Sequence, residues 1–298
     1  MASPLARPVP APLPRGGARA GGAPRVPPRG AARLARRARA RREVRVRRAA
    51  ALALAATALA SPAAGQEGGR VTTSQAAWWL QYFGDHRLGG GRVALLLDLQ
   101  ARRRDVAAEP AQVLLRGAGV YTLSPVVRLG AGYAFAQTWP PDDVEPPASF
   151  PEHRLFEAMY LLHDAGRVQF RHRYFLEQRW LGRMAVDSAT GDARVSRWDF
   201  LLRARYQLRL NVLLNRPTLG PGTVYAYGGD ELFVAFGAQA GPNLFDQNRL
   251  FTGLGWQFAR HLRAEVGYVN QLIVRPSGQR VDVNHTLVTQ LVSVAPLF

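Results

Sequence analysis

The 298-residue chain contains no cysteine and no lysine. The lack of cysteine excludes disulfides, thiolate metal sites, iron–sulfur clusters and a cysteine nucleophile. All 39 basic residues are therefore arginine, and they face only 21 acidic residues, which gives a formal charge of +18. A charge of this size suits a nucleic-acid or anionic-membrane partner only if it belongs to the folded part of the protein, so its distribution decides its meaning.

Much of the basic excess lies at the start of the chain. Residues 1–65 hold 14 basic residues and one acidic residue, whereas residues 66–298 hold 25 and 20. The exclusive use of arginine, together with abundant alanine and glycine, is typical of a GC-rich genome rather than of phosphate recognition. We predict no nucleic-acid partner.

The first residues have the composition of a leader. Residues 1–46 are rich in Arg, Pro, Ala and Gly and are predicted to be disordered. Arginines then precede the uncharged run Ala49–Ala60, which has the length of a signal-peptide core and is too short for a membrane helix. We predict a cleaved signal peptide at 47–65. A later translation start, at Val44 or Val46, is the alternative reading of the leader.

No later segment reaches the roughly 18 consecutive apolar residues of a membrane helix. From Ala76 onward, apolar and polar residues instead alternate with a period of two, which indicates strands. The clearest case is Arg167–Trp180, where arginines and Glu177 occupy one face while aromatic and aliphatic residues occupy most of the other.

Eleven segments show this alternation, and all of them exceed the five or six residues of an average globular strand. They are 75–84, 92–102, 111–123, 126–138, 152–163, 167–181, 194–211, 223–236, 246–259, 262–275 and 283–298. Their length suits tilted strands that cross a membrane, and the connections alternate between short and long, as in bacterial outer-membrane barrels.

The sequence thus predicts an all-β fold, a single antiparallel transmembrane β-barrel over residues 66–298 in the Gram-negative outer membrane. Because single-chain bacterial barrels have an even number of strands, we predict twelve strands, with an extra short one near 68–75. Ten strands are the alternative. A soluble periplasmic β-sandwich is the competing fold.

The polar face of the strands is predicted to line the lumen. Its charged candidates are Asp98, Arg116, Arg128, Arg171, Arg173, Glu177, Arg179, Arg203, Arg205, Glu231, Arg249, Arg263 and Glu265. Arginines outnumber carboxylates. Two interpretations stay open: a ladder of ion pairs that fills a narrow barrel, or a porin-like, water-filled path that prefers small anions.

Aromatic residues near the segment ends suit the interfacial girdles of a barrel. They are Trp78, Trp79, Tyr82, Phe83, Tyr133, Phe135, Trp139, Tyr225, Tyr227, Trp256 and Phe258. Phe298 ends the last segment and resembles the signal that the outer-membrane assembly machinery recognises. Expected partners are therefore this machinery, outer-membrane lipid and lipopolysaccharide.

Several short motifs, taken in order, resemble one known family. They include Trp79-Leu80-Gln81-Tyr82, Leu115-Arg116-Gly117, Gly130-Ala131-Gly132-Tyr133, Phe170 to Arg179, Arg203-Ala204-Arg205 and Phe245 to Arg249. From Trp78 to Phe298 the chain is similar to the family called domain of unknown function 2490. The resemblance implies an outer-membrane barrel and implies no activity.

Motifs for soluble enzymes are missing. The sequence has no HExxH, GxSxG, P-loop or GxGxxG pattern, so we predict no enzyme, no catalytic residues, no metal and no cofactor. The alternative is an outer-membrane lipid-modifying enzyme that uses His285 and Ser293, with His172 as another candidate. The carboxylates of Asp230, Glu231 and Asp246 are expected to meet lumen arginines or to hold a cation.

Overall fold

The computed structural model describes residues 71–141, 148–187, 189–237, 240, 244–275 and 277–297. By its contacts the chain divides into Met1–Ala49 and Ala50–Phe298, and every described residue belongs to the second unit. The predicted leader, the predicted signal peptide and Phe298 lie outside the described residues.

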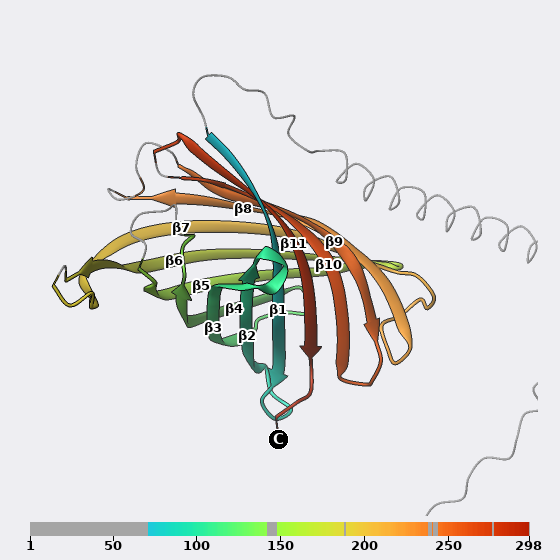
Figure 1. Ribbon diagram of the computed structural model, residues 1–298. Helices are drawn as coiled ribbons and strands as arrows, with labels where there is room; N and C mark the ends of the chain where they lie inside the picture. Colours follow the sequence, from blue (N-terminus) through green and yellow to red (C-terminus); the bar gives the residue numbers. More distant parts are fainter. Residues whose placement is uncertain are drawn as a thin grey trace, which may run out of the picture. The chain divides into compact units, whose positions relative to one another are not determined.

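The described residues form one closed barrel of eleven strands, with a single 3-10 turn at Asp105–Ala107 (Figure 1). The strands are β1 Val71–Arg87, β2 Val93–Arg104, β3 Glu109–Thr122, β4 Val127–Thr138, β5 Phe150–Ala165, β6 Val168–Val186, β7 Ala193–Leu213, β8 Thr223–Phe236, β9 Phe245–Gln257, β10 Leu262–Val274 and β11 Arg280–Ser293. Each of the eleven alternating segments corresponds to one strand, so the prediction of an all-β barrel is confirmed.

The predicted strand number of twelve is wrong, and so is the alternative of ten. Consecutive strands pair in antiparallel fashion, but β1 and β11 pair in parallel, from Val71 opposite Arg280 to Gly84 opposite Ser293 (Figure 1). A parallel seam lets an odd number of strands close, which the parity argument did not allow. Residues from Val71 onward, assigned to an extra strand, are the start of β1.

The registers set the width of the barrel. Followed once round the ring, they return to β1 displaced by about 14 residues, a stagger that tilts the strands by roughly 40°. Eight-stranded barrels are filled by side chains, whereas barrels of 16 or more strands hold an aqueous channel. Eleven strands place this barrel between those cases.

The connections form two rims. The turn rim comprises 88–92, 123–126, 166–167, 214–222 and 258–261, and the loop rim comprises 105–108, 139–149, 187–192, 237–244 and 275–279. β6 and β7 are the longest strands and extend their hairpin on the loop-rim side. The predicted alternation of short and long connections is only partial, because 214–222 on the turn rim is long and 105–108 is short.

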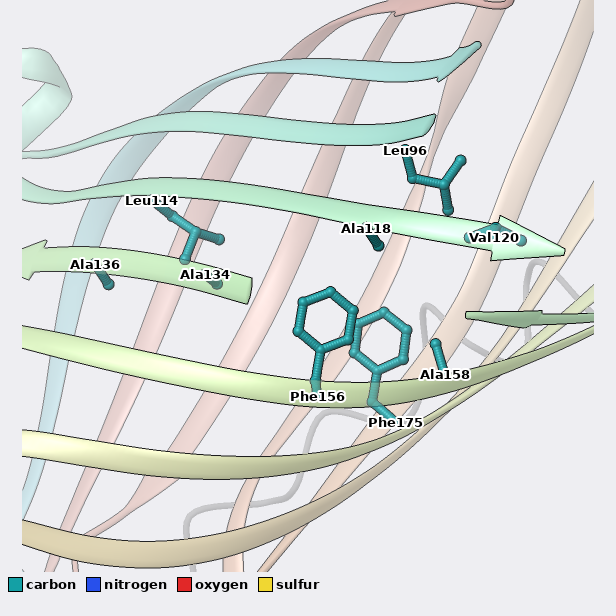
Figure 2. Close-up of a cluster of buried hydrophobic side chains, with 9 residues drawn as sticks. All are labelled: Leu96, Leu114, Ala118, Val120, Ala134, Ala136, Phe156, Ala158 and Phe175. Carbon is teal, nitrogen blue, oxygen red and sulfur yellow. The ribbon is translucent and has the colours of Figure 1, made fainter. Parts of the chain in front are cut away.

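Part of the inner wall is apolar. Phe156 of β5 and Phe175 of β6 stack with their ring centroids 5.0 Å apart. Figure 2 shows these two rings beside small or aliphatic side chains of β2 to β5, which are Leu96, Leu114, Ala118, Val120, Ala134, Ala136 and Ala158. Small residues on β3 and β4 make room for the two rings, so packed apolar side chains fill this side of the lumen.

Candidate functional site: the arginine-lined lumen

The interior contains a cavity of about 630 Å³ that is lined by residues of all eleven strands. It extends from Arg275, in the loop rim, to Arg171 and Arg263, close to the turn rim. Thirteen arginines but only six carboxylates line it. The cavity therefore follows the length of the barrel and carries an excess of positive charge.

The thirteen charged residues predicted for the lumen fall on this interior. Twelve line the cavity: Asp98, Arg116, Arg128, Arg171, Arg173, Arg179, Arg203, Arg205, Glu231, Arg249, Arg263 and Glu265. The thirteenth, Glu177, is completely buried beneath the arginines that surround it.

Glu177 is the centre of the largest ion-pair group. Arg203 donates from Nε to Oε2 at 2.7 Å, and Arg205 donates from Nη1 to Oε1 at 2.6 Å. Arg116 approaches from β3, with Nη2 3.8 Å from Oε1. Two strands, β3 through Arg116 and β7 through Arg203 and Arg205, are thus joined to β6 by one carboxylate.

Glu231 forms a second centre. Its Oε1 accepts from Arg173 at 2.8 Å and from Arg205 at 2.6 Å, while Oε2 lies 3.6 Å from Nη1 of Arg249. Asp246 accepts from Arg203 at 3.0 Å. Glu231 and Asp246 therefore meet arginines, which is one of the two roles that the sequence allowed for them.

Aromatic faces support the guanidinium groups. Arg116, Arg173 and Arg205 lie 5.1–5.3 Å from the Phe175 ring centroid. Arg203, Arg205 and Arg249 lie 4.6–5.3 Å from that of Phe233. The sequence reading did not place these rings in the lumen. The alternation would have located Phe175, since it shares a face with Arg173 and Glu177.

Several aromatic residues assigned to the girdles face inward instead. Trp79, Phe83 and Tyr227 line the cavity, and Tyr225, only 1% exposed, donates its hydroxyl to Glu265 Oε1 at 2.6 Å. Neighbouring residues of a strand point to opposite faces, so Trp78 and Trp79 cannot both face outward. Tyr133, Trp256 and Phe258 remain exposed.

Several polar side chains on the outer wall form hydrogen-bonded pairs with neighbouring side chains. Tyrosine hydroxyls meet histidine rings at Tyr82–His86, Tyr133–His153, Tyr206–His172 and Tyr268–His285. Gln178 donates to Glu157 at 3.0 Å, and Asn248 donates to Asp230 at 2.8 Å. His172 and His285, both considered as catalytic candidates, are thus engaged with tyrosines.

His285 and Ser293 do not form a catalytic pair. They lie eight positions apart on β11, which corresponds to about 26 Å along a strand. The described residues bring together no group of His, Asp or Glu that could hold a metal ion. In the same part of the chain, no helix is long and apolar enough to cross a bilayer.

Comparison with known proteins gives one match. A family model described as "Protein of unknown function (DUF2490)" matches residues 76–282, from the first strand to the last. No curated protein and no solved structure matches the chain.

Proposed function

Because the chain belongs to the DUF2490 family, whose description assigns no activity, we propose its function from the barrel itself: a Gram-negative outer-membrane protein whose lumen is a narrow, anion-preferring path. The observation that carries the proposal is the cavity bounded by all eleven strands, with thirteen arginines against six carboxylates.

The outer wall supports a membrane location. Large apolar side chains that are more than one-third exposed occur on every strand of the ring. They include Leu80, Leu99, Leu115, Leu129, Leu155, Leu176, Phe200, Leu232, Leu254, Val266 and Leu287. Soluble monomers rarely expose such a continuous apolar surface, whereas a barrel in lipid requires it. Outer-membrane lipid and the assembly machinery are the partners that this location implies.

The lumen supports anion preference. Low-dielectric walls focus the field of the excess guanidinium groups, which attracts anions and repels cations. The ion pairs around Glu177 and Glu231 narrow the path without neutralising it, because arginines remain in excess. The proposal includes no catalytic step.

Conductance across a planar bilayer tests the proposal. In a KCl gradient, the purified full chain is expected to give small conductance steps. The reversal potential is expected to shift towards the equilibrium potential of chloride. Substituting Glu for Arg263, which has no ion-pair partner within the described residues, is expected to reduce the chloride preference. Cation preference, or a bilayer that stays silent while the barrel is folded, would refute the path.

Glu157 tests the membrane location separately. It lies near the middle of β5 on the outer wall, where lipid would surround its carboxylate. Replacing it with glutamine is expected to stabilise the barrel in lipid vesicles by about 1 kcal/mol, because an outward carboxylate is costly there. Urea unfolding measures the change. Asp164→Asn at the turn rim is the control, with almost no effect expected from an exposed pair. An unchanged or lower stability of E157Q in vesicles would argue against lipid at this wall.

A further inference from the structure

Two arginines of the lumen share one aromatic ring. Trp79 of β1 is 6% exposed and lies directly opposite Arg102 of β2. The Arg102 guanidinium lies 4.1 Å from the Trp79 ring centroid, and that of Arg249 lies 5.2 Å from it. Because β9 is separated from β1 by two strands of the ring, Arg249 reaches across the interior to this position.

The Arg102 side chain lacks a carboxylate partner. Its Nε and Nη2 donate to Oε1 of Gln100 at 3.0 and 2.6 Å, a neutral acceptor. In the described part of the chain, no acidic side chain lies within ion-pair distance of Arg102, and its Nη1 has no hydrogen-bond partner. A guanidinium that lies over a ring keeps its N–H edge free for partners in its own plane.

Arg249 is weakly compensated. The nearest carboxylate oxygen, on Glu231, is 3.6 Å away, and Arg173 and Arg205 share that carboxylate. Its other neighbours are neutral amides: Gln247 lies 3.4 Å from Nη2, and the side chain of Gln271 lies 3.2 Å from the same atom.

The surroundings of this pair are strongly positive. Arg102 interacts electrostatically with three other arginines, Arg249, Arg154 and Arg116, and with the carboxylate of Asp98. Two cations on one buried ring repel each other unless an anion lies between or beside them. Fork-shaped guanidinium groups match the paired oxygens of carboxylates and phosphates better than they match a halide.

We propose that Arg102, Arg249 and Trp79, with the amides of Gln100, Gln247 and Gln271, form a binding site for an oxyanion, a phosphate or carboxylate group, inside the lumen. All six residues line the cavity, so a solute that enters the barrel can reach them. The site deepens the proposed anion path, since it makes the path a selective one in which oxyanions bind and slow the passage of chloride.

Binding to the full chain, folded in detergent micelles, tests the site without requiring conductance. Inorganic phosphate and acetate are titrated separately at constant ionic strength, with chloride as the balancing anion, and are followed by calorimetry. We expect saturable binding of at least one oxyanion. Arg102→Gln is expected to weaken it tenfold or more, since a charge-assisted hydrogen bond contributes about 1.5–3 kcal/mol.

Arg263→Gln is the matched control. It removes the same charge from the same cavity, but near the turn rim, so binding is expected to stay within about twofold of wild type. Equal weakening by both variants would show a general field effect and overturn the site. Absence of oxyanion binding to the folded wild-type chain would overturn it as well.

The binding measurement, taken together with the conductance measurement, distinguishes the site from the path. Oxyanion binding without conductance would keep the site and refute the path. Chloride conductance that phosphate and acetate leave unchanged, in a barrel that binds neither of them, would keep the path and refute the site.

Discussion

Replacing Glu177 with glutamine is expected to destabilise the folded barrel by about 3 kcal/mol. The carboxylate is completely buried and accepts from Arg203 and Arg205, with Arg116 nearby. Glutamine keeps the shape but removes the charge that compensates these guanidinium groups. The loss of stability is expected at the lower end of the range for a broken buried ion pair, because each arginine retains a second carboxylate. These remaining pairs are Arg203–Asp246, Arg205–Glu231 and Arg116–Asp98.

Urea unfolding in lipid vesicles, followed by tryptophan fluorescence, measures the loss. Glu177→Asp keeps the charge and is expected to lose less than the glutamine variant. If Glu177→Gln instead unfolded at the wild-type urea concentration, the ion pairs at the centre of the lumen would not be what holds β3, β6 and β7 together.

The strand pattern was predictable because the chemistry of each strand differs between its two faces. From Arg167 to Trp180, every arginine and glutamate stands at an odd-numbered position, and the structure places Arg171, Arg173 and Arg179 on the cavity side. A register error of one residue would turn these arginines outward, so the pattern strongly specifies which side faces the lumen.

The closure of the barrel was not predictable in the same way. Alternation along a strand says which residues share a face, but not which strand lies beside it. The seam depends on backbone pairing of β1 with β11 over Val71–Gly84, which leaves no periodic mark in the sequence. The assumption of an even strand number therefore decided the count, and it failed because the two end strands run in the same direction.

The lumen site was predictable only in part. The arginines and carboxylates belong to the polar face, but their partners come from strands that are distant in the sequence, as with Arg173 and Glu231. Trp79 was assigned to a girdle because aromatic residues near strand ends usually face the membrane interface. The register of β1 on β2 places Trp79 opposite Arg102, and the sequence alone does not give this register.

Gly132 should be nearly irreplaceable, and Gly132→Ala is expected to cost about 3 kcal/mol. An added Cβ would overlap the carbonyl oxygen of Gly117 and lie 2.7 Å from both the Ala118 Cβ and the Phe156 Cζ. A ring can rotate away, but a carbonyl oxygen in the β3–β4 ladder cannot move without breaking the pairing of Ala118 with Gly132. The stack of Phe156 on Phe175 would be displaced with it.

Gly119→Ala is the matched control, because a Cβ on this β3 residue meets nothing within 4 Å. It is expected to change the free energy of unfolding by less than about 1 kcal/mol, with the sign toward stabilisation.

A double variant distinguishes the two clashes at Gly132, one with the Gly117 carbonyl oxygen and one with the Phe156 ring. Combining Gly132→Ala with Phe156→Leu removes the clash with the ring and leaves the clash with the backbone, so only partial recovery is expected. Full recovery in the double variant would mean that the ring alone excludes a side chain here. A tolerated Gly132→Ala would mean that β3 and β4 do not approach each other in this register.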